Sequence, residues 1–150
     1  MKRVAVLLLA LLVCLTGCGG GEEITIKIED LADDLLESGA FGETLYQVEA
    51  DRASLLLGVE VDCPAQIWIG TGATAEELLI LDAGDDQEAQ TLMEGLGQHV
   101  AGQTASYASY LPGEVYKLEN AILERYGNYV ILCVAADAAA AQSVIDGYVK

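Results

Sequence analysis

The stretch IGTGATAEELLILDAGD, residues 69–85, permits two interpretations that lead to different folds, so the choice between them decides the fold. Its G-x-G-x-x-A spacing is that of a dinucleotide-binding loop that opens a helix. Alternatively, the stretch is the turn and second strand of a hairpin. The apolar run Leu78–Leu81 is strand-like, and any helix would end by Gly84, which is too short for the crossover of a βαβ unit. The sequence therefore predicts a hairpin.

An internal repeat supports this interpretation. LLILDAGDDQEAQTLMEGL begins at Leu78 and VILCVAADAAAAQSVIDGY begins at Val130, an offset of 52 that aligns Asp85 with Asp137. Each copy reads as an apolar strand, an aspartate in the N-cap position and then a helix. The repeat predicts that a helix starts at Asp85 or Asp86 and not earlier.

Each copy is also preceded by a candidate strand. These strands are expected at Ala65–Ile69 and Leu118–Arg125, the second joined to its partner by a short turn at Tyr126-Gly127-Asn128. Two β-β-α units result. The predicted fold class is α+β, with a mainly antiparallel sheet built from the two units and N-terminal helices packed on it.

Three helices follow from apolar spacing and end signals, at Glu29–Ser38, Ala50–Leu57 and Asp86 to about Tyr110. Residues 24–28 alternate apolar and polar, as in a half-buried strand or an extended arm. The strands at Leu78–Leu81 and Val130–Val134 are apolar on both faces, so helices should cover both faces. The two repeat helices are expected on one side and the Glu29–Ser38 helix on the other.

The N-terminus resembles a bacterial lipoprotein precursor. Met1-Lys2-Arg3 is a positive n-region, and Val4–Val13 is an aliphatic run too short to span a bilayer. Leu15-Thr16-Gly17-Cys18 then resembles a lipobox, which implies that signal peptidase II recognises Leu15, Thr16 and Gly17 and that Cys18 is lipidated. The alternative is an ordinary secretory signal with an incidental cysteine. We expect residues 1–17 to be a signal peptide, 18–23 a glycine-rich tether and 24–150 one domain.

The charge of the chain restricts its partners. The formal net charge is -17, and loss of Lys2 and Arg3 with the signal would make it -19. Such a surface repels nucleic acid and anionic lipid headgroups. The composition thus excludes a nucleic-acid role and leaves a cationic envelope partner open, although solubility alone accounts for the charge.

The cysteines carry little information. Cys14 would leave with the signal and Cys18 would carry the lipid, so Cys63 and Cys133 remain. These two could pair outside the cytoplasm. Cys133 lies in a strand-like run, however, and is also explained as a small buried apolar residue.

No arrangement of residues predicts a catalytic, metal or cofactor site. His99 is the only histidine and has no neighbours at zinc-ligand spacing, and the acidic turn at Asp82–Asp86 lacks the oxygen spacing of a calcium loop. No G-x-S-x-G motif is present. Glu76 and Glu77 are adjacent, so on a strand they point to opposite faces and cannot form a carboxylate dyad.

Two segments carry a family resemblance. GATAEELLILDAGD, from Gly72, and SYLPGEVYKLENAILERYGNYVILCVAAD, from Ser109, resemble the clostridial-type lipoproteins of the domain-of-unknown-function family numbered 4358. The resemblance covers about Leu31 to Val149. It implies one extracytoplasmic domain behind a lipid anchor in a Gram-positive envelope, and it brings no catalytic residues.

Three functional hypotheses remain. The first is a lipid-anchored, non-catalytic binding or interaction module of the cell envelope. The second is an envelope hydrolase that uses acidic residues, which a pocket holding converging carboxylates or His99 with an acid would favour. The third is a ligand-capturing accessory to a transporter.

Overall fold

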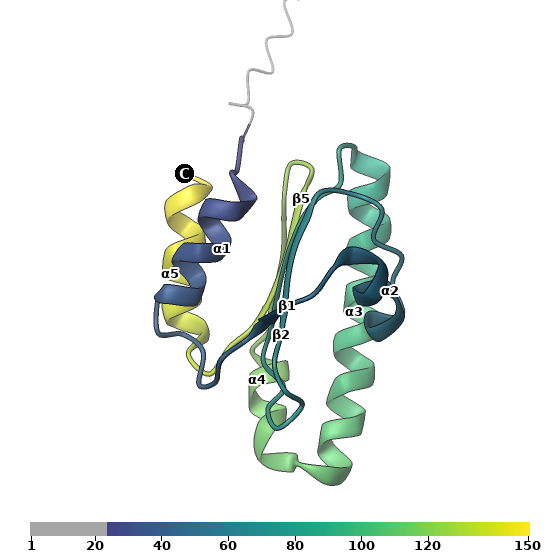
Figure 1. The fold of residues 1–150 in the computed structure, drawn as a ribbon, viewed down its shortest axis with the longest axis vertical. Helices are drawn as coiled ribbons and strands as arrows, with labels where there is room; N and C mark the ends of the chain where they lie inside the picture. The colour runs from purple at the N-terminus through teal and green to yellow at the C-terminus, as the bar shows by residue number, and fades with distance from the viewer. Residues whose placement is uncertain (1–23) are drawn as a thin grey trace, which may run out of the picture.

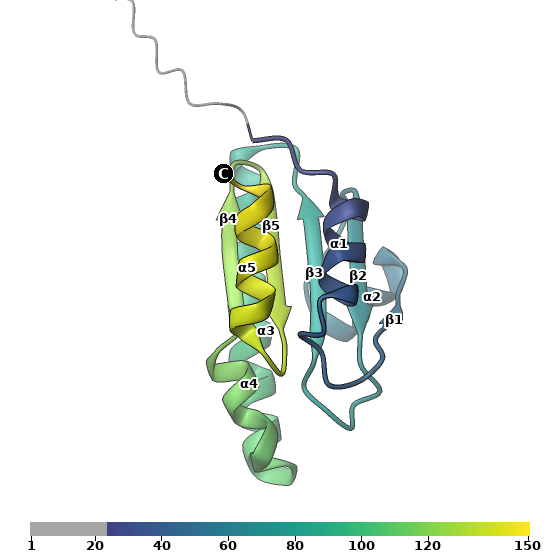
Figure 2. The same cartoon turned by 90° about the vertical axis from the view of Figure 1, so that its left-hand side faces the viewer.

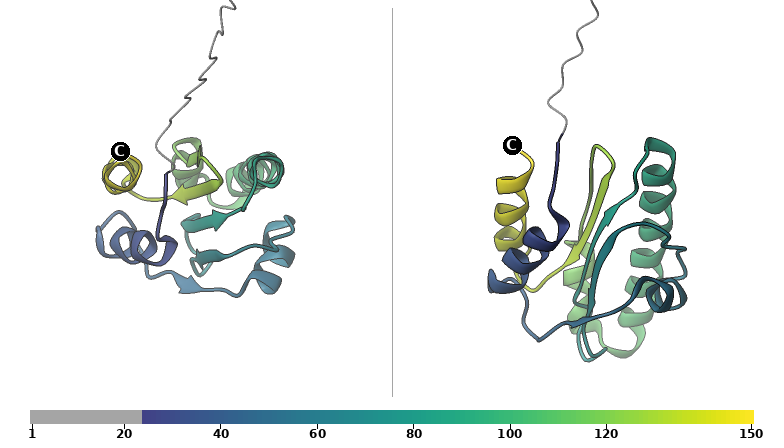
Figure 3. Two further views of the ribbon diagram at one scale, coloured as in Figure 1. Left: turned by 90° about the horizontal axis from the view of Figure 1, so that it is seen from above. Right: turned by 45° about the horizontal axis from the view of Figure 1, so that its top comes forward.

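The computed structural model describes residues 24–150, which form a five-stranded antiparallel sheet between two layers of helices (Figures 1 and 3). The strand order is β1-β2-β3-β5-β4. The strands are β1 (Tyr46–Gln47), β2 (Ala65–Ile69), β3 (Glu77–Asp82), β4 (Ile122–Tyr126) and β5 (Tyr129–Val134). The helices are α1 (Ile28–Glu37), α2 (Ala50–Leu57), α3 (Asp86–Tyr110), the 3-10 turn η1 (Pro112–Glu114), α4 (Val115–Glu119) and α5 (Ala138–Tyr148). The predicted α+β class and the two β-β-α units are confirmed.

The deciding stretch is a hairpin. β2 pairs antiparallel with β3, Ile69 opposite Glu77, and the backbone N–H of Gly70 donates to the Glu76 carbonyl at 3.1 Å. In the turn Gly72 has a φ of +84°, in the left-handed region that favours glycine. No helix starts at this loop, so the dinucleotide-loop interpretation has no structural basis.

Gly72→Ala is therefore expected to destabilise the protein by on the order of 1 kcal/mol or more, because alanine is strained at positive φ. Gly102→Ala is the matched control: Gly102 lies inside α3 without positive φ, and a Cβ added there would meet open space, so alanine should stabilise the helix by up to about 1 kcal/mol. Urea unfolding measures both. Equal effects at the two positions, or sub-millimolar NAD or ATP binding that Gly72→Ala abolishes, would contradict the hairpin account.

The central strands are buried on both faces. From β3, Leu79 and Leu81 pack towards α2 and α3, whereas Leu78 and Ile80 pack towards α1 and α5. All four side chains are fully buried. The prediction that helices cover both faces is confirmed, and Figure 2 shows α1 and α5 lying side by side over one of them.

The expected placement of the repeat helices is wrong. α3 and α5 lie on opposite faces, and α1 shares its face with α5. The register explains this result. Leu79 pairs with Leu132, so these two share a face, but the residue 52 positions after Leu79 is Ile131, which faces the other layer. Equivalent residues of the two copies therefore face opposite sides of the sheet. For the same reason, the helices that follow the two strands lie on opposite sides.

Element ends agree with the sequence in most places. Asp85 caps α3 by accepting from the Glu88 N–H at 2.9 Å, and Asp137 caps α5 by accepting from the Ala140 N–H at 3.0 Å. The strand expected at Leu118–Arg125 starts too early, because α4 continues to Glu119 and β4 spans only Ile122–Tyr126. Residues 24–27 are an extended arm with Ile26 buried, not a strand.

Cys63 and Cys133 are both free cysteines. Cys63 packs on the α3 side of the sheet and Cys133 is buried on the α5 side, so the sheet separates them. Burial raises the pKa of the Cys133 thiol to about 12. Cys133 is thus the small buried apolar residue of the second interpretation.

Candidate functional site

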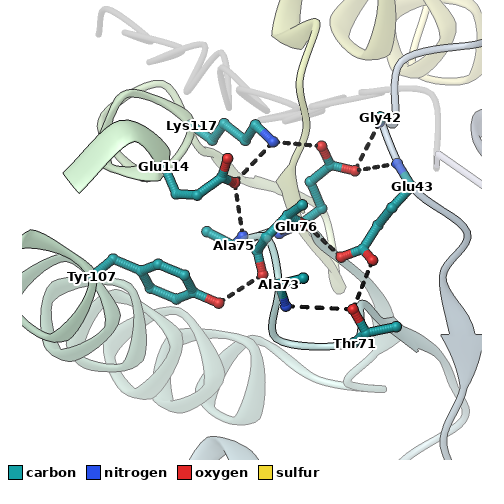
Figure 4. A network of polar contacts seen from close by, with 10 residues as sticks. Gly42, Glu43, Thr71, Ala73, Ala75, Glu76, Tyr107, Glu114 and Lys117 are labelled. Carbon is teal, nitrogen blue, oxygen red and sulfur yellow. Dashed lines mark hydrogen bonds and ion pairs between the residues drawn. The ribbon is translucent and has the colours of Figure 1, made fainter. Parts of the chain in front are cut away.

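The β2–β3 turn holds the densest set of polar contacts among residues 24–150 (Figure 4). The set centres on Glu76, the residue directly before β3, which is only 1% exposed. We use the term Glu76 cluster for Glu43, Glu76, Glu114 and Lys117. Their side chains come from the loop before β1, the β2–β3 turn, η1 and α4.

Glu76 ties three segments together. Its Oε2 accepts from the backbone N–H of Gly42 at 2.8 Å and of Glu43 at 3.1 Å, and its Oε1 accepts from Lys117 Nζ at 2.7 Å. Gly42 also has to be small, because a Cβ there would lie 3.0 Å from Glu76 Oε1. Both carboxylate oxygens of Glu76 are therefore occupied by partners within the fold.

Lys117 is a buried cation between two carboxylates. Its Nζ lies 2.7 Å from Glu76 Oε1 and 2.8 Å from Glu114 Oε2. Burial alone would lower the pKa of Lys117, but the hydrogen bonds and charges of Glu114 and Glu76 outweigh it and raise the pKa above the ordinary lysine value. Lys117 therefore stays a charged ammonium and does not supply a neutral amine for nucleophilic chemistry.

Glu114 and Glu43 hold the turn itself. Glu114 Oε2 accepts from the Ala75 N–H at 3.0 Å. Burial would raise the pKa of Glu114, but the bonds from Lys117 and Ala75 lower it below the ordinary value. Glu43 accepts from the hydroxyls of Thr74 and Thr71, and the Thr74 bond is the largest cause of its lowered pKa.

Gly70 has a different role from Gly72. A Cβ at Gly70 would lie 2.3 Å from Glu43 Oε1, so the missing side chain makes room for the carboxylate. Gly70 does not have positive φ. The G-x-G pair of the turn thus serves one close approach and one backbone conformation.

Tyr107 fastens the turn to α3. Its hydroxyl donates to the Thr74 carbonyl at 2.6 Å, and its ring lies 4.8 Å from that of Tyr110 between centroids. Burial, followed by the neighbouring Tyr110, raises the pKa of Tyr107. The phenol is therefore a fixed donor at neutral pH.

Glu77 contacts His99 while Glu76 contacts Lys117, so the two adjacent carboxylates have separate partners. His99 Nε2 lies 2.9 Å from Glu77 Oε1, and the two side chains are 6% and 5% exposed. Burial would lower the pKa of His99, but the bond and charge of Glu77, with the Leu57 carbonyl, raise it. This pair is a second buried ionic contact, between β3 and the middle of α3.

The sequence did not predict these contacts. Glu43, Glu114 and Lys117 carry no motif, and each joins Glu76 or its turn from more than 30 positions away. The only signal in the sequence was the pair of glutamates in a turn that leads directly into an apolar strand. The residues that the sequence did select, Leu15, Thr16, Gly17 and Cys18, lie outside the described residues.

The chemistry open to the two ionic groups is limited. The side chains of Glu76, Glu77, Lys117 and His99 are buried and already paired, and none of them lines the four surface hollows at Ile24, Gly58, Ser38 and Tyr46. Within residues 24–150 no three histidine, cysteine or acidic side chains are grouped so that they could hold a metal ion. In that same range no helix is both long and apolar enough to cross a membrane.

The fold and the cluster together define an α+β domain: an antiparallel sheet between two helical layers, with its β2–β3 turn held by a buried ionic cluster. Residues 56–135, just over half of the chain, match the family described as Domain of unknown function (DUF4358). The chain belongs to this family. No curated protein and no solved structure matches it.

Proposed function

We propose that this chain is a lipid-anchored binding or interaction module on the extracytoplasmic face of the cell membrane, without catalysis. One observation carries the proposal, namely the order of segments ahead of the domain. A positive n-region, the apolar run Val4–Val13, the Leu15-Thr16-Gly17-Cys18 box and a glycine tether come directly before the domain that begins at Ile24. Two acyl chains on Cys18 would hold the protein stably at the membrane.

The anchor would fix which end of the domain faces the membrane. Residues 18–23 span at most about 20 Å when fully extended. Ile24 lies in one surface hollow with Gly127 of the β4–β5 turn, beside the Asp82 end of β3. The Glu76 cluster is at the other end of β3, the strand labelled in Figure 2, so the cluster would point away from the membrane.

The distribution of side chains supports binding over catalysis. The buried ionic residues already form ion pairs with one another within the fold. Several large apolar side chains instead remain exposed: Tyr46, Leu55, Leu56, Tyr110, Leu111 and Tyr116. Exposed apolar groups on a domain of net charge -17 fit a protein surface that receives a partner, and the charge favours a cationic one.

An envelope hydrolase is the second candidate, favoured by the contact between His99 and Glu77. Such a pair resembles a base with its orienting acid. A substrate would have to reach a side chain that is only 6% exposed, however, and neither residue lines the two hollows beside α2, at Gly58 and at Tyr46. The pair is better placed to join α3 to β3 than to contact a substrate.

Replacing Cys18 with alanine is expected to abolish lipidation, because no other cysteine lies in a box that can receive the thioether. Metabolic labelling with a clickable fatty acid in a bacterial host measures the modification. Cys14→Ala is the matched control and should keep the label, since Cys14 precedes the box. Label retained on the Cys18→Ala protein would refute the anchor.

A further inference from the structure

The free edge of β1 and the neighbouring helix α2 form a shallow apolar groove. Tyr46 of β1 and Leu56 of α2 line it, and each is 58% exposed. The groove has a volume of about 380 Å³ and is partly open to solvent. This is large enough for one or two side chains of a partner.

The edge of the sheet at β1 offers backbone groups to a partner. Tyr46 and Gln47 pair with Ile69 and Trp68 of β2, and the Val48 N–H donates to the Ile67 carbonyl at 2.9 Å. Backbone groups alternate in direction along a strand, so the N–H and C=O of Gln47 face away from β2. Figure 2 shows β1 at the border of the sheet with no further described strand beside it.

Glu49 and Arg52 are the charged residues that line the groove, and Arg52 is the cation of the pair. It lines the groove from α2, and among the lysines and arginines of residues 24–150 it is the one that forms no ion pair with another described residue. Its guanidinium presents planar donors that suit a carboxylate. Arg52 can thus pair with a carboxylate of a partner, while Glu49 in the same lining favours a basic group nearby.

We propose that this groove binds an extended segment of a cationic partner protein, which adds a strand to β1. One apolar side chain of the segment lies between Tyr46 and Leu56, and one carboxylate pairs with Arg52. The inference deepens the proposed function, because it assigns the binding surface of the module. Strand addition to a free sheet edge is a common mode of peptide recognition, in which backbone pairing gives affinity and side-chain pockets give specificity.

Charge determines the type of partner. The chain carries a formal charge of -17, so a second copy approaching this edge would be repelled, whereas a cationic protein would be attracted over several ångströms. The bound segment needs a carboxylate only at the position that faces Arg52. The occupant is thus a segment with an acidic residue on a partner that is basic overall.

A phage-displayed library of linear dodecapeptides tests the proposal, selected against the detergent-solubilised mature protein and counter-selected against the Arg52→Gln/Leu56→Ser double variant. The expected result is enrichment of extended sequences that combine an apolar residue with Asp or Glu. The enriched peptide, made synthetically, should lose about tenfold in affinity with either single variant, as expected for one charge-assisted contact or one anchor side chain. Isothermal titration calorimetry measures the affinity.

Two matched controls isolate the groove. Lys27→Gln removes the same charge at an exposed site outside the groove, and Leu55→Ser changes the neighbouring leucine, which is 86% exposed but does not line the groove. Both should leave peptide affinity unchanged. Thermal unfolding of each variant shows whether the fold is intact.

Several results would overturn this inference: no enrichment over the double variant, enriched peptides without a carboxylate, or equal losses with the control variants. Self-association that Arg52→Gln abolishes would assign the surface to a second copy and also overturn it. Lipid labelling at Cys18 is a separate readout. A failed selection with normal labelling therefore refutes the groove and leaves the lipid anchor standing.

Discussion

Lys117→Met is expected to destabilise the domain by about 3–5 kcal/mol, because removing one partner of a buried pair leaves the other charge buried and uncompensated. Here two carboxylates lose their cation, Glu76 at 2.7 Å and Glu114 at 2.8 Å. Methionine has a similar length, so lost packing contributes little. A loss of this size is a large fraction of the roughly 5–15 kcal/mol that stabilises a typical domain. Urea unfolding with linear extrapolation measures it.

Lys150→Met is the control, since Lys150 pairs with Asp146 on the surface at 3.8 Å and such pairs contribute about 0–1 kcal/mol. The Glu76→Gln/Lys117→Met double variant removes both charges and should cost less than the sum of the single changes. If Lys117→Met cost no more than Lys150→Met, the Glu76 cluster would not be what holds the β2–β3 turn.

The second large effect is a pH dependence that belongs to His99. Its pKa in the folded protein is raised, so the folded state binds the proton more tightly than the unfolded state. The resulting stabilisation is present in full below the ordinary histidine pKa of about 6.5 and is lost as the pH rises through the raised value. We therefore expect the free energy of unfolding to fall as the pH rises from the ordinary histidine pKa to the raised pKa of His99.

His99→Gln should remove this slope, because glutamine can still donate to Glu77 but does not titrate. His99 is the only histidine of the chain, so no other imidazole contributes in this window. The lowered pKa values of Glu43 and Glu114 act on the acid side, where stability is lost as the pH falls below the ordinary glutamate value. If the free energy of unfolding changed with pH in the same way for the wild type and for His99→Gln above pH 6.5, the buried pair would be uncharged.

The sequence predicted the elements of the fold because their signals are local. Apolar spacing placed α2 at Ala50–Leu57, and apolar spacing with the N-cap Asp85 placed α3 at Asp86–Tyr110. The short glycine-containing turn at Gly127 separated β4 from β5. The strand expected at Leu118–Arg125 was too long at its start, where the structure has the end of α4. A helix as short as α4 has too few residues to show a helical period in the sequence.

The relation between the two repeat units was not predictable in the same way. It depends on the register of β3 against β5, which pairs Leu79 with Leu132 and not with Ile131, its counterpart in the repeat. A shift of one residue reverses the face of every side chain in a strand. Repeat alignment alone therefore cannot place α3 and α5 on the same side or on opposite sides.

The candidate site was missed for a related reason. Glu76 meets Lys117 across 41 positions and Gly42 across 34, and no spacing rule links such residues. Gly95 is a similar case. From the sequence it only weakens α3, but in the fold a Cβ there would meet Val59 at 3.0 Å, so the glycine permits close packing.

We propose above that this domain of the DUF4358 family is held at the extracytoplasmic face by a lipid on Cys18. The most direct test is mass spectrometry of the N-terminal peptide, taken from protein extracted from the membranes of cells that make the full 150-residue chain. The account predicts a peptide that begins at Cys18 and carries a diacylglyceryl thioether. A peptide that retains any of residues 1–17, or one in which Cys18 is a free thiol, would contradict it.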